Sequence, residues 1–163
     1  MKQEQIILPS WLQNRFIVLI GLMGAGKTRL GRILAESFKL PFIDTDIEIE
    51  KAAGITIEEI FNNFGETYFR NGEQKVINRV LNGEPSILAT GGGAFMNSVT
   101  RKKIEKFGIS IWLRADINLL VKRTESRSGR PLLKNGNRRE ILSKLMKERY
   151  PVYSEADIVF NIS

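Results

Sequence analysis

The chain has 163 residues, 42% of them hydrophobic and 26% charged, and its net charge is +7 at pH 7. The length suits one compact domain, and the composition is ordinary for a globular protein. Because the sequence contains neither cysteine nor histidine, disulfides, thiolate catalysis, Cys/His zinc sites and imidazole acid–base steps are excluded. No apolar run reaches the ~18 residues of a transmembrane helix, and the absence of cysteine is compatible with the cytoplasmic location that we expect.

In chain order, an N-terminal extension at residues 1–14, too short in apolar sequence for a signal peptide, precedes alternating strands and helices. The first half should contain a strand at 15–21, a helix at 28–39, a strand at 41–44, a helix at 46–54, a helix beginning with the capping box of Thr56 and Glu59, and a helix at 66–82. The second half should contain a strand at 86–90, a helix at 98–108, a strand at 109–115 and a helix at 116–125. A loop at 126–137, a helix at 138–150 and a strand at 156–162 should follow. This alternation predicts right-handed βαβ crossovers in a single three-layer α/β domain over residues 1–163, with a five-stranded parallel sheet flanked by helices.

The first strand runs into GLMGAGKT at residues 21–28, which fits the phosphate-loop pattern of nucleotide-binding proteins. Glycines allow successive backbone N–H groups to face phosphates, and the N-terminus of the following helix adds positive potential. Lys27 would reach the β- and γ-phosphates, and the Thr28 hydroxyl would bind Mg²⁺. A glycine-rich turn without a ligand is the alternative, which the strand–loop–helix setting disfavours.

Two further motifs follow strands, so they should gather with the phosphate loop at one edge of the sheet. Asp44 and Asp46 close the second strand, where alternation would send both to the same side. One carboxylate could face a metal and its waters while the other accepts from a substrate hydroxyl. Helix capping by Asp46 explains that residue equally well.

Three consecutive glycines, Gly91, Gly92 and Gly93, follow the third strand. Their cost in backbone entropy indicates a close approach of other groups, and their amides could bind a carboxylate or phosphate. A tight turn alone is the alternative. The strand before them carries no Asp at its end, which disfavours a motor or switch NTPase.

Basic residues have two interpretations as a group, because a net positive charge suits an anionic ligand but also a merely basic surface. They are scattered rather than gathered in a stripe with aromatic residues, which disfavours nucleic-acid binding.

Arg70 and Glu73, spaced i and i+3, would by themselves be a surface pair worth under ~1 kcal/mol. Arg130, in the 126–137 loop, could close over phosphates or be a solvated charge. Arg149 precedes Pro151 and would compensate a helix dipole at the helix end.

Taken together, GLMGAGKT, FIDTD, GETYFRNGE, ATGGG, GRPLL and ERYPVY, in this order and spacing, resemble the motifs of shikimate kinases over about residues 16–160. The resemblance implies a P-loop NTPase of the nucleoside monophosphate kinase-like type with a lid loop at 126–137. It implies an enzyme that uses ATP and Mg²⁺ to phosphorylate the 3-hydroxyl of shikimate, on the route to chorismate and aromatic amino acids. It also implies a monomer that binds small-molecule substrates and neither nucleic acid nor membrane.

The resemblance further implies roles for individual residues. The ATP-binding residues would be Gly24, Ala25, Gly26, Lys27, Thr28 and Arg29, with Arg123 near the adenine and Arg130 on the transferring phosphate. Thr28 would hold Mg²⁺, and Asp44 would steady the water shell of the metal. The acceptor would be bound by Asp46, Arg70, Glu73, Gly91, Gly92, Gly93 and Arg149. The catalytic residues would be Lys27, Asp46 and Arg130.

Two alternatives stay open at this point. A kinase for another polyol acid, such as gluconate, could share a related fold, although the triple glycine and the pair of Arg70 and Arg149 favour shikimate. A regulatory nucleotide binder should lack an acceptor site, whereas every expected acceptor residue up to Arg149 is present.

Overall fold

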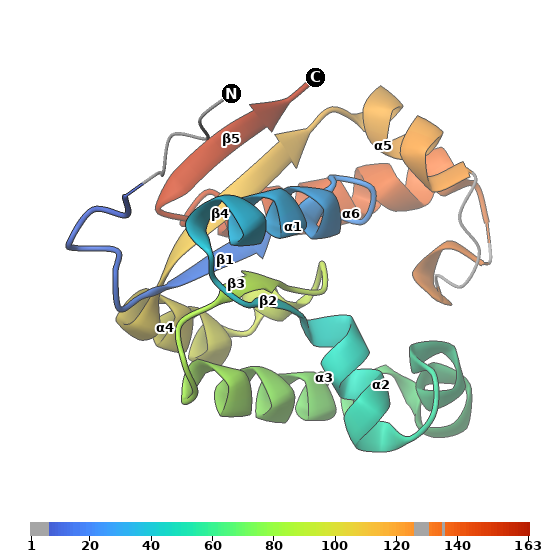
Figure 1. The fold of residues 1–163 in the computed structure, drawn as a ribbon. Helices are drawn as coiled ribbons and strands as arrows, with labels where there is room; N and C mark the ends of the chain where they lie inside the picture. Colours follow the sequence, from blue (N-terminus) through green and yellow to red (C-terminus); the bar gives the residue numbers. More distant parts are fainter. Residues whose placement is uncertain (1–6, 126–130, 135) are drawn as a thin grey trace.

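The computed structural model describes residues 7–125, 131–134 and 136–163. Its centre is a five-stranded parallel sheet in the order β2-β3-β1-β4-β5 (Figure 1). The strands are β1 (Phe16–Ile20), β2 (Phe42–Asp44), β3 (Ile87–Ala89), β4 (Gly108–Ala115) and β5 (Ile158–Ile162). Leu19 of β1 is in register with Ala89 of β3 and with Ile111 of β4. The predicted α/β class and parallel sheet are therefore confirmed.

Helices cover both faces of the sheet, because both faces of its central strand are apolar. On one face, Ile17 and Leu19 of β1 pack in a cluster with Ala35 of helix α1 (Lys27–Phe38). On the other face, Val18 and Ile20 join a larger cluster with α3 (Ile57–Leu81), α4 (Ser98–Phe107), α5 (Ile117–Glu125) and α6 (Arg138–Tyr153). A buried parallel strand of this kind reads as a continuous apolar run, and all five residues of β1 are buried.

A third, smaller apolar cluster lies beside the sheet. It joins α2 (Thr45–Ala53) to α3 through Ile49, Ile60, Phe69 and Val76. Helix α3 begins with the predicted capping box, in which the Thr56 hydroxyl accepts from the Glu59 amide at 3.2 Å. It bends at Gly65, where φ is 83° and ψ is 176°. The two helices predicted on either side of residue 65 therefore meet at a glycine kink.

The end of α6 differs from the prediction. The expected helix stopped at residue 150, whereas α6 continues through Pro151 to Tyr153. Proline in the last turn lacks one N–H donor, but the buried ring of Tyr153 packs against Trp112 and Phe95 and stabilises the continuation. Two short 3₁₀ helices, η1 (Ala94–Met96) and η2 (Pro131–Leu133), were also not predicted.

The N-terminal extension packs on the sheet where the structure describes it. Leu8 and Leu12 join the cluster on the α1 side, and Leu12 is buried. Within the described ranges, none of the helices combines the length and apolar character that crossing a membrane requires.

Candidate active site

A pocket of about 720 Å³ lies beyond the carboxyl ends of β1, β2 and β3. It brings together nearly all the site residues that the sequence predicted: Gly24, Gly26, Lys27, Thr28, Arg29, Asp44, Asp46, Arg70, Glu73, Gly91, Gly92, Gly93 and Arg149. Ala25, which belongs to the phosphate loop, is buried, and Arg130 lies outside the described residues. The expectation that motifs following separate strands meet at one sheet edge is therefore confirmed.

The phosphate loop connects β1 to α1 and depends on backbone angles that favour glycine. Gly24 and Gly26 have φ values of 86° and 98°, in the left-handed region that disfavours a Cβ. Helix α1 has no side-chain cap at Gly26, so its first N–H groups face the pocket edge as an anion-binding terminus. The Lys27 ammonium holds the loop through the carbonyls of Gly21 and Leu22, at 2.7 and 3.1 Å.

Arg123 of α5 supports the same loop from outside the pocket. One of its Nη atoms donates to the carbonyl oxygens of Gly24 and Ala25, both at 3.3 Å. Gly24 also lies against α5, since a Cβ added there would be 3.0 Å from the Thr124 side chain. Arg123 thus contacts the phosphate loop, and its expected place near the adenine stays a prediction.

Asp44 connects the phosphate loop to helix α2. One carboxylate oxygen accepts from the Thr28 hydroxyl at 3.1 Å, and the other accepts from the Asp46 amide at 3.0 Å. Asp44 therefore caps α2, and the expectation that Asp46 could be the cap is wrong. Strand alternation does not relate the two aspartates either, because β2 ends at Asp44 and Asp46 lies in the first helical turn. Both nevertheless line the pocket.

The Thr28 hydroxyl and the Asp44 carboxylate fit a magnesium site. Mg²⁺ prefers oxygen ligands and keeps several of its waters, so few protein ligands are needed. No group of three or more Asp or Glu side chains in the described ranges is arranged to hold a metal. The chain would therefore supply the Thr28 hydroxyl and, through water, Asp44, with phosphate oxygens completing the coordination.

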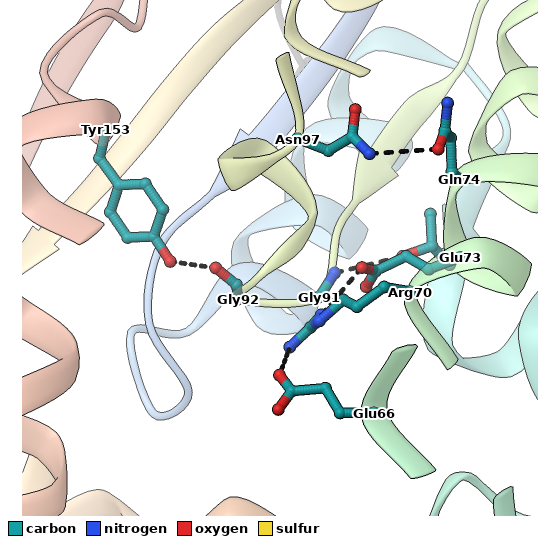
Figure 2. Close-up of polar contacts among 9 residues, drawn as sticks. Glu66, Arg70, Glu73, Gln74, Gly91, Gly92, Asn97 and Tyr153 are labelled. Atoms are coloured by element: carbon teal, nitrogen blue, oxygen red, sulfur yellow. Dashed lines mark hydrogen bonds and ion pairs between the residues drawn. The ribbon is translucent and has the colours of Figure 1, made fainter. Parts of the chain in front are cut away.

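On the opposite wall, Arg70 and Glu73 of α3 form an ion pair whose carboxylate is buried and whose guanidinium is partly exposed (Figure 2). Arg70 donates to Glu73 at 2.8 Å and to Glu66 at 3.3 Å. Glu73 is only 2% exposed, so the interpretation as a surface pair is wrong. Burial raises the pKa of Glu73, while the charge of Arg70 opposes the shift and the charge of Asp46 adds to it. Such a pair keeps its arginine in place, because moving the guanidinium away would leave the buried carboxylate as an uncompensated charge.

The three glycines lie against side chains that line the pocket. A Cβ at Gly91 would lie 2.8 Å from Glu73 Oε2, and one at Gly92 would lie 2.9 Å from an Nη atom of Arg149. At Gly93 the nearest atom would be Cζ of Arg70, at 2.4 Å. The predicted close approach is confirmed, and the interpretation as a turn alone is wrong, because side chains that line the pocket fill the space of the missing Cβ atoms.

Arg149 is a buried residue inside α6. It is 6% exposed and helical residues continue beyond it to Tyr153. The interpretation as a charge that compensates the end of a helix is therefore wrong. Instead, Arg149 approaches Gly92 while Arg70 approaches Gly93, so both arginines reach the glycine turn, which is made of Gly91, Gly92 and Gly93.

Sequence reasoning missed several residues of the site. The buried Thr45 hydroxyl accepts from the Gly91 amide at 3.2 Å. Phe61 and Phe69 line the pocket, with ring centroids 4.8 Å apart. The Tyr153 hydroxyl donates to the Gly92 carbonyl. The spacing of Arg149 and Tyr153, one helical turn apart, could have indicated a shared face had α6 been extended correctly.

The described part of the predicted lid loop reaches the pocket. Pro131 and Leu132 of η2 line it. Lys134 forms an ion pair with Glu58 near the start of α3. The expected position of Arg130 beside the phosphates stays a prediction, since that residue lies outside the described ranges.

The family model for shikimate kinase matches residues 23–163. The chain belongs to the shikimate kinase family. A shikimate kinase of Paramagnetospirillum magneticum is 57% identical over 146 residues, which cover 90% of this chain and 75% of the relative. A shikimate kinase of Mesorhizobium japonicum is 51% identical over 147 residues, covering 90% and 72% of the two chains.

Solved structures of the shikimate kinase family also match. A shikimate kinase from Acinetobacter baumannii in complex with shikimate has a TM-score of 0.90 at 38% identity, covering 94% of this chain and 87% of that one. A gluconokinase from Sinorhizobium meliloti has a TM-score of 0.58 at 18% identity, covering 93% and 85%. The likeness to the gluconokinase shows a shared fold alone. The choice between shikimate and gluconate as the acceptor therefore depends on the residues of the site.

Proposed function

We propose that this chain transfers the γ-phosphoryl group of ATP to the 3-hydroxyl of shikimate and so produces shikimate 3-phosphate and ADP. Membership of the shikimate kinase family supports the reaction. The observation that carries the proposal is geometric: two arginines from separate helices, Arg70 and Arg149, meet at the glycine turn inside the pocket that also contains the phosphate loop. A carboxylate and a triphosphate could therefore bind side by side.

The phosphate-loop side would bind MgATP. The amides at the start of α1 and the Lys27 ammonium would bind phosphate oxygens. The metal, when bound, neutralises charge on the phosphates, and Thr28 with Asp44 would hold it and its waters. The Lys27 ammonium bonds to the carbonyls of Gly21 and Leu22 at 2.7 and 3.1 Å, which keeps it at the phosphate loop.

The acceptor side would bind an anionic ring. Arg70 and Arg149 would bind the shikimate carboxylate, because paired guanidinium groups recognise a carboxylate by geometry as well as by charge. Glu73 would keep Arg70 in place through the bond at 2.8 Å. Asp46, between the two sides of the pocket, would accept a hydrogen bond from the attacking hydroxyl and orient it.

In the transfer step, the 3-oxygen of shikimate forms a bond to the γ-phosphorus while the bond from that phosphorus to the β,γ-bridging oxygen breaks. ADP leaves with the electron pair of the broken bond, and the hydroxyl proton passes to Asp46 or to solvent. Such a reaction needs positioning and positive charge more than a covalent catalyst. The proposal also includes Arg130, which by resemblance to the family would bind the transferring phosphoryl group.

ADP release with MgATP tests the function, with shikimate, gluconate or water as the acceptor. We expect release that depends on shikimate and that Asp46→Asn reduces strongly. Release without any acceptor would instead mean an ATPase, and release with gluconate alone would mean a different polyol kinase. Omitting Mg²⁺ tests whether the release requires the metal.

The monomeric state and the cytoplasmic location stay predictions. Light scattering would test the first, and cell fractionation would test the second.

A further inference from the structure

Tyr153 is a buried tyrosine that touches the site without being assigned to it. It is 0% exposed, and its ring packs against Trp112 with the centroids 5.8 Å apart. Its hydroxyl leaves this apolar surrounding and donates to the carbonyl of Gly92 (Figure 2). The ring of Tyr153 thus belongs to the core, while its hydroxyl contacts the glycine turn of the pocket.

The guanidinium of Arg149 approaches the same point. A Cβ built on Gly92 would lie 2.9 Å from an Nη atom of Arg149 and 3.7 Å from the Tyr153 hydroxyl. Arg149 and Tyr153 are one helical turn apart on α6, so both project from one face of the helix. Burial raises the pKa of Tyr153 to about 12, although the nearby Arg149 opposes the shift. The hydroxyl therefore keeps its proton, and hence its bond to Gly92, at neutral pH.

The phenol has one proton and two lone pairs. Its proton goes to the Gly92 carbonyl, which leaves the lone pairs for the neighbouring guanidinium. Tyr150, on the same helix and partly buried, serves as the comparison: its hydroxyl donates to the Ala115 carbonyl at 2.6 Å, and it does not line the pocket. Tyr153 differs because both of its polar neighbours line the pocket.

We propose that Tyr153 is a positioning residue for the acceptor, whose hydroxyl joins the Gly92 carbonyl to the Arg149 guanidinium and thereby sets where Arg149 meets a substrate carboxylate. The inference rests on the proposed function, in which Arg149 binds that carboxylate. Tyr153 itself would touch neither substrate. Its effect should appear in the affinity for shikimate and not in that for ATP, because the phosphate loop has no contact with its hydroxyl among the hydrogen bonds of the described residues.

The test compares Tyr153→Phe with Tyr150→Phe. Both variants keep the ring and remove a buried hydroxyl from a backbone carbonyl, so both should lower the melting temperature. We expect Tyr153→Phe to raise the KM for shikimate about tenfold, the factor that corresponds to one hydrogen bond to a charged group, with the KM for ATP unchanged. Tyr150→Phe should change neither KM. An unchanged KM for shikimate in Tyr153→Phe would overturn the inference.

Arg149→Lys separates this inference from the proposed function. An unchanged KM for shikimate in Arg149→Lys would remove the acceptor assignment itself. A raised KM there, combined with normal behaviour of Tyr153→Phe, would overturn only the role of Tyr153. If Tyr153 acts through Arg149, the two substitutions are not independent. The free-energy change calculated from the KM for shikimate should then be smaller in the double variant than the sum of the changes in Arg149→Lys and Tyr153→Phe.

A spectroscopic measurement keeps the proposal testable even if Tyr153→Phe folds poorly. Tyr68, Tyr150 and Tyr153 are the three tyrosines of the chain. In a Tyr68→Phe/Tyr150→Phe protein, fluorotyrosine would therefore label position 153 alone. We expect its fluorine resonance to shift when shikimate is added and to stay unchanged with ADP. A resonance that does not respond to shikimate would contradict the proposal.

Discussion

The guanidinium of Arg70 donates to Oε1 of Glu73 at 2.8 Å, while Oε2 of the same carboxylate has no hydrogen-bond partner among the described residues. Oε2 instead lies over Gly91, within 2.8 Å of where a Cβ would be. The carboxylate is thus half satisfied by the protein, and both residues of the pair line the pocket. The pair is therefore a structural element and a part of the wall that we propose binds the acceptor.

Removing the arginine should affect binding and stability together. We expect Arg70→Ala to raise the KM for shikimate by about 10- to 100-fold, which is the range for losing a hydrogen bond to a charged group, and to leave the KM for ATP near its normal value. The variant should also unfold more easily, because the buried charge of Glu73 loses its main partner. Steady-state kinetics and thermal unfolding measure the two effects.

Arg79→Ala is the matched control on the same helix. Arg79 pairs with Glu48 at 3.4 Å, but its side chain is 61% exposed, and such surface pairs contribute little. Its loss should change neither the KM for shikimate nor the melting temperature by much. Normal shikimate kinetics in Arg70→Ala would remove the assignment of Arg70 to the acceptor.

The raised pKa of Glu73 predicts a pH dependence of stability. The folded state binds the Glu73 proton more tightly than the unfolded state, whose pKa is near 4.5. Through this group, the free energy of unfolding therefore falls as the pH rises from about 4.5 through the folded-state pKa. Glu73→Gln cannot titrate, so the stability of the variant relative to the wild type should increase over that interval. Urea unfolding at a series of pH values measures this, and parallel curves for the two proteins would contradict it.

The glycine turn predicts a steric effect at Gly93. Alanine there would place its Cβ 2.4 Å from Cζ of Arg70, so the guanidinium would have to move away from Glu73. We expect Gly93→Ala to raise the KM for shikimate severalfold and to leave that for ATP unchanged. In contrast, Gly72→Ala on α3 meets nothing within 4 Å and should stabilise the helix by about 0.5–1 kcal/mol. Equal kinetics in the two variants would show that the turn tolerates a side chain.

Asp44 caps α2 and is proposed to hold the waters of the metal, and different substitutions should separate the two roles. Asn still caps a helix, whereas Ala does not. Asp44→Asn should therefore keep the melting temperature and raise the Mg²⁺ concentration needed for half-maximal activity. Asp44→Ala should show the same change in Mg²⁺ requirement and also lose about 1 kcal/mol of stability. A normal Mg²⁺ requirement in Asp44→Asn would exclude the carboxylate from the metal site.

Local sequence patterns were enough to predict the strands, the α-helices apart from the end of α6, and the phosphate loop. The glycines of the loop require φ values that other residues avoid, and the Thr56 capping box satisfies amides within one turn of itself. Interactions of this kind are complete within a few residues, so the sequence specifies them directly. The apolar run of β1 likewise predicted a strand, and all five of its residues are buried.

The sequence by itself thus determined the fold class, the strand–loop–helix unit and which residues could serve a phosphate and a carboxylate. Only the tertiary structure decided that the i, i+3 pair of Arg70 and Glu73 is buried, that Arg149 lies inside a helix, and that Tyr153 ends on Gly92. The same spacing occurs on exposed and buried helix faces, since burial depends on segments that are distant in the chain. The meeting of α3, α6 and the glycine turn is therefore a property of the packed protein and not of any one of its motifs.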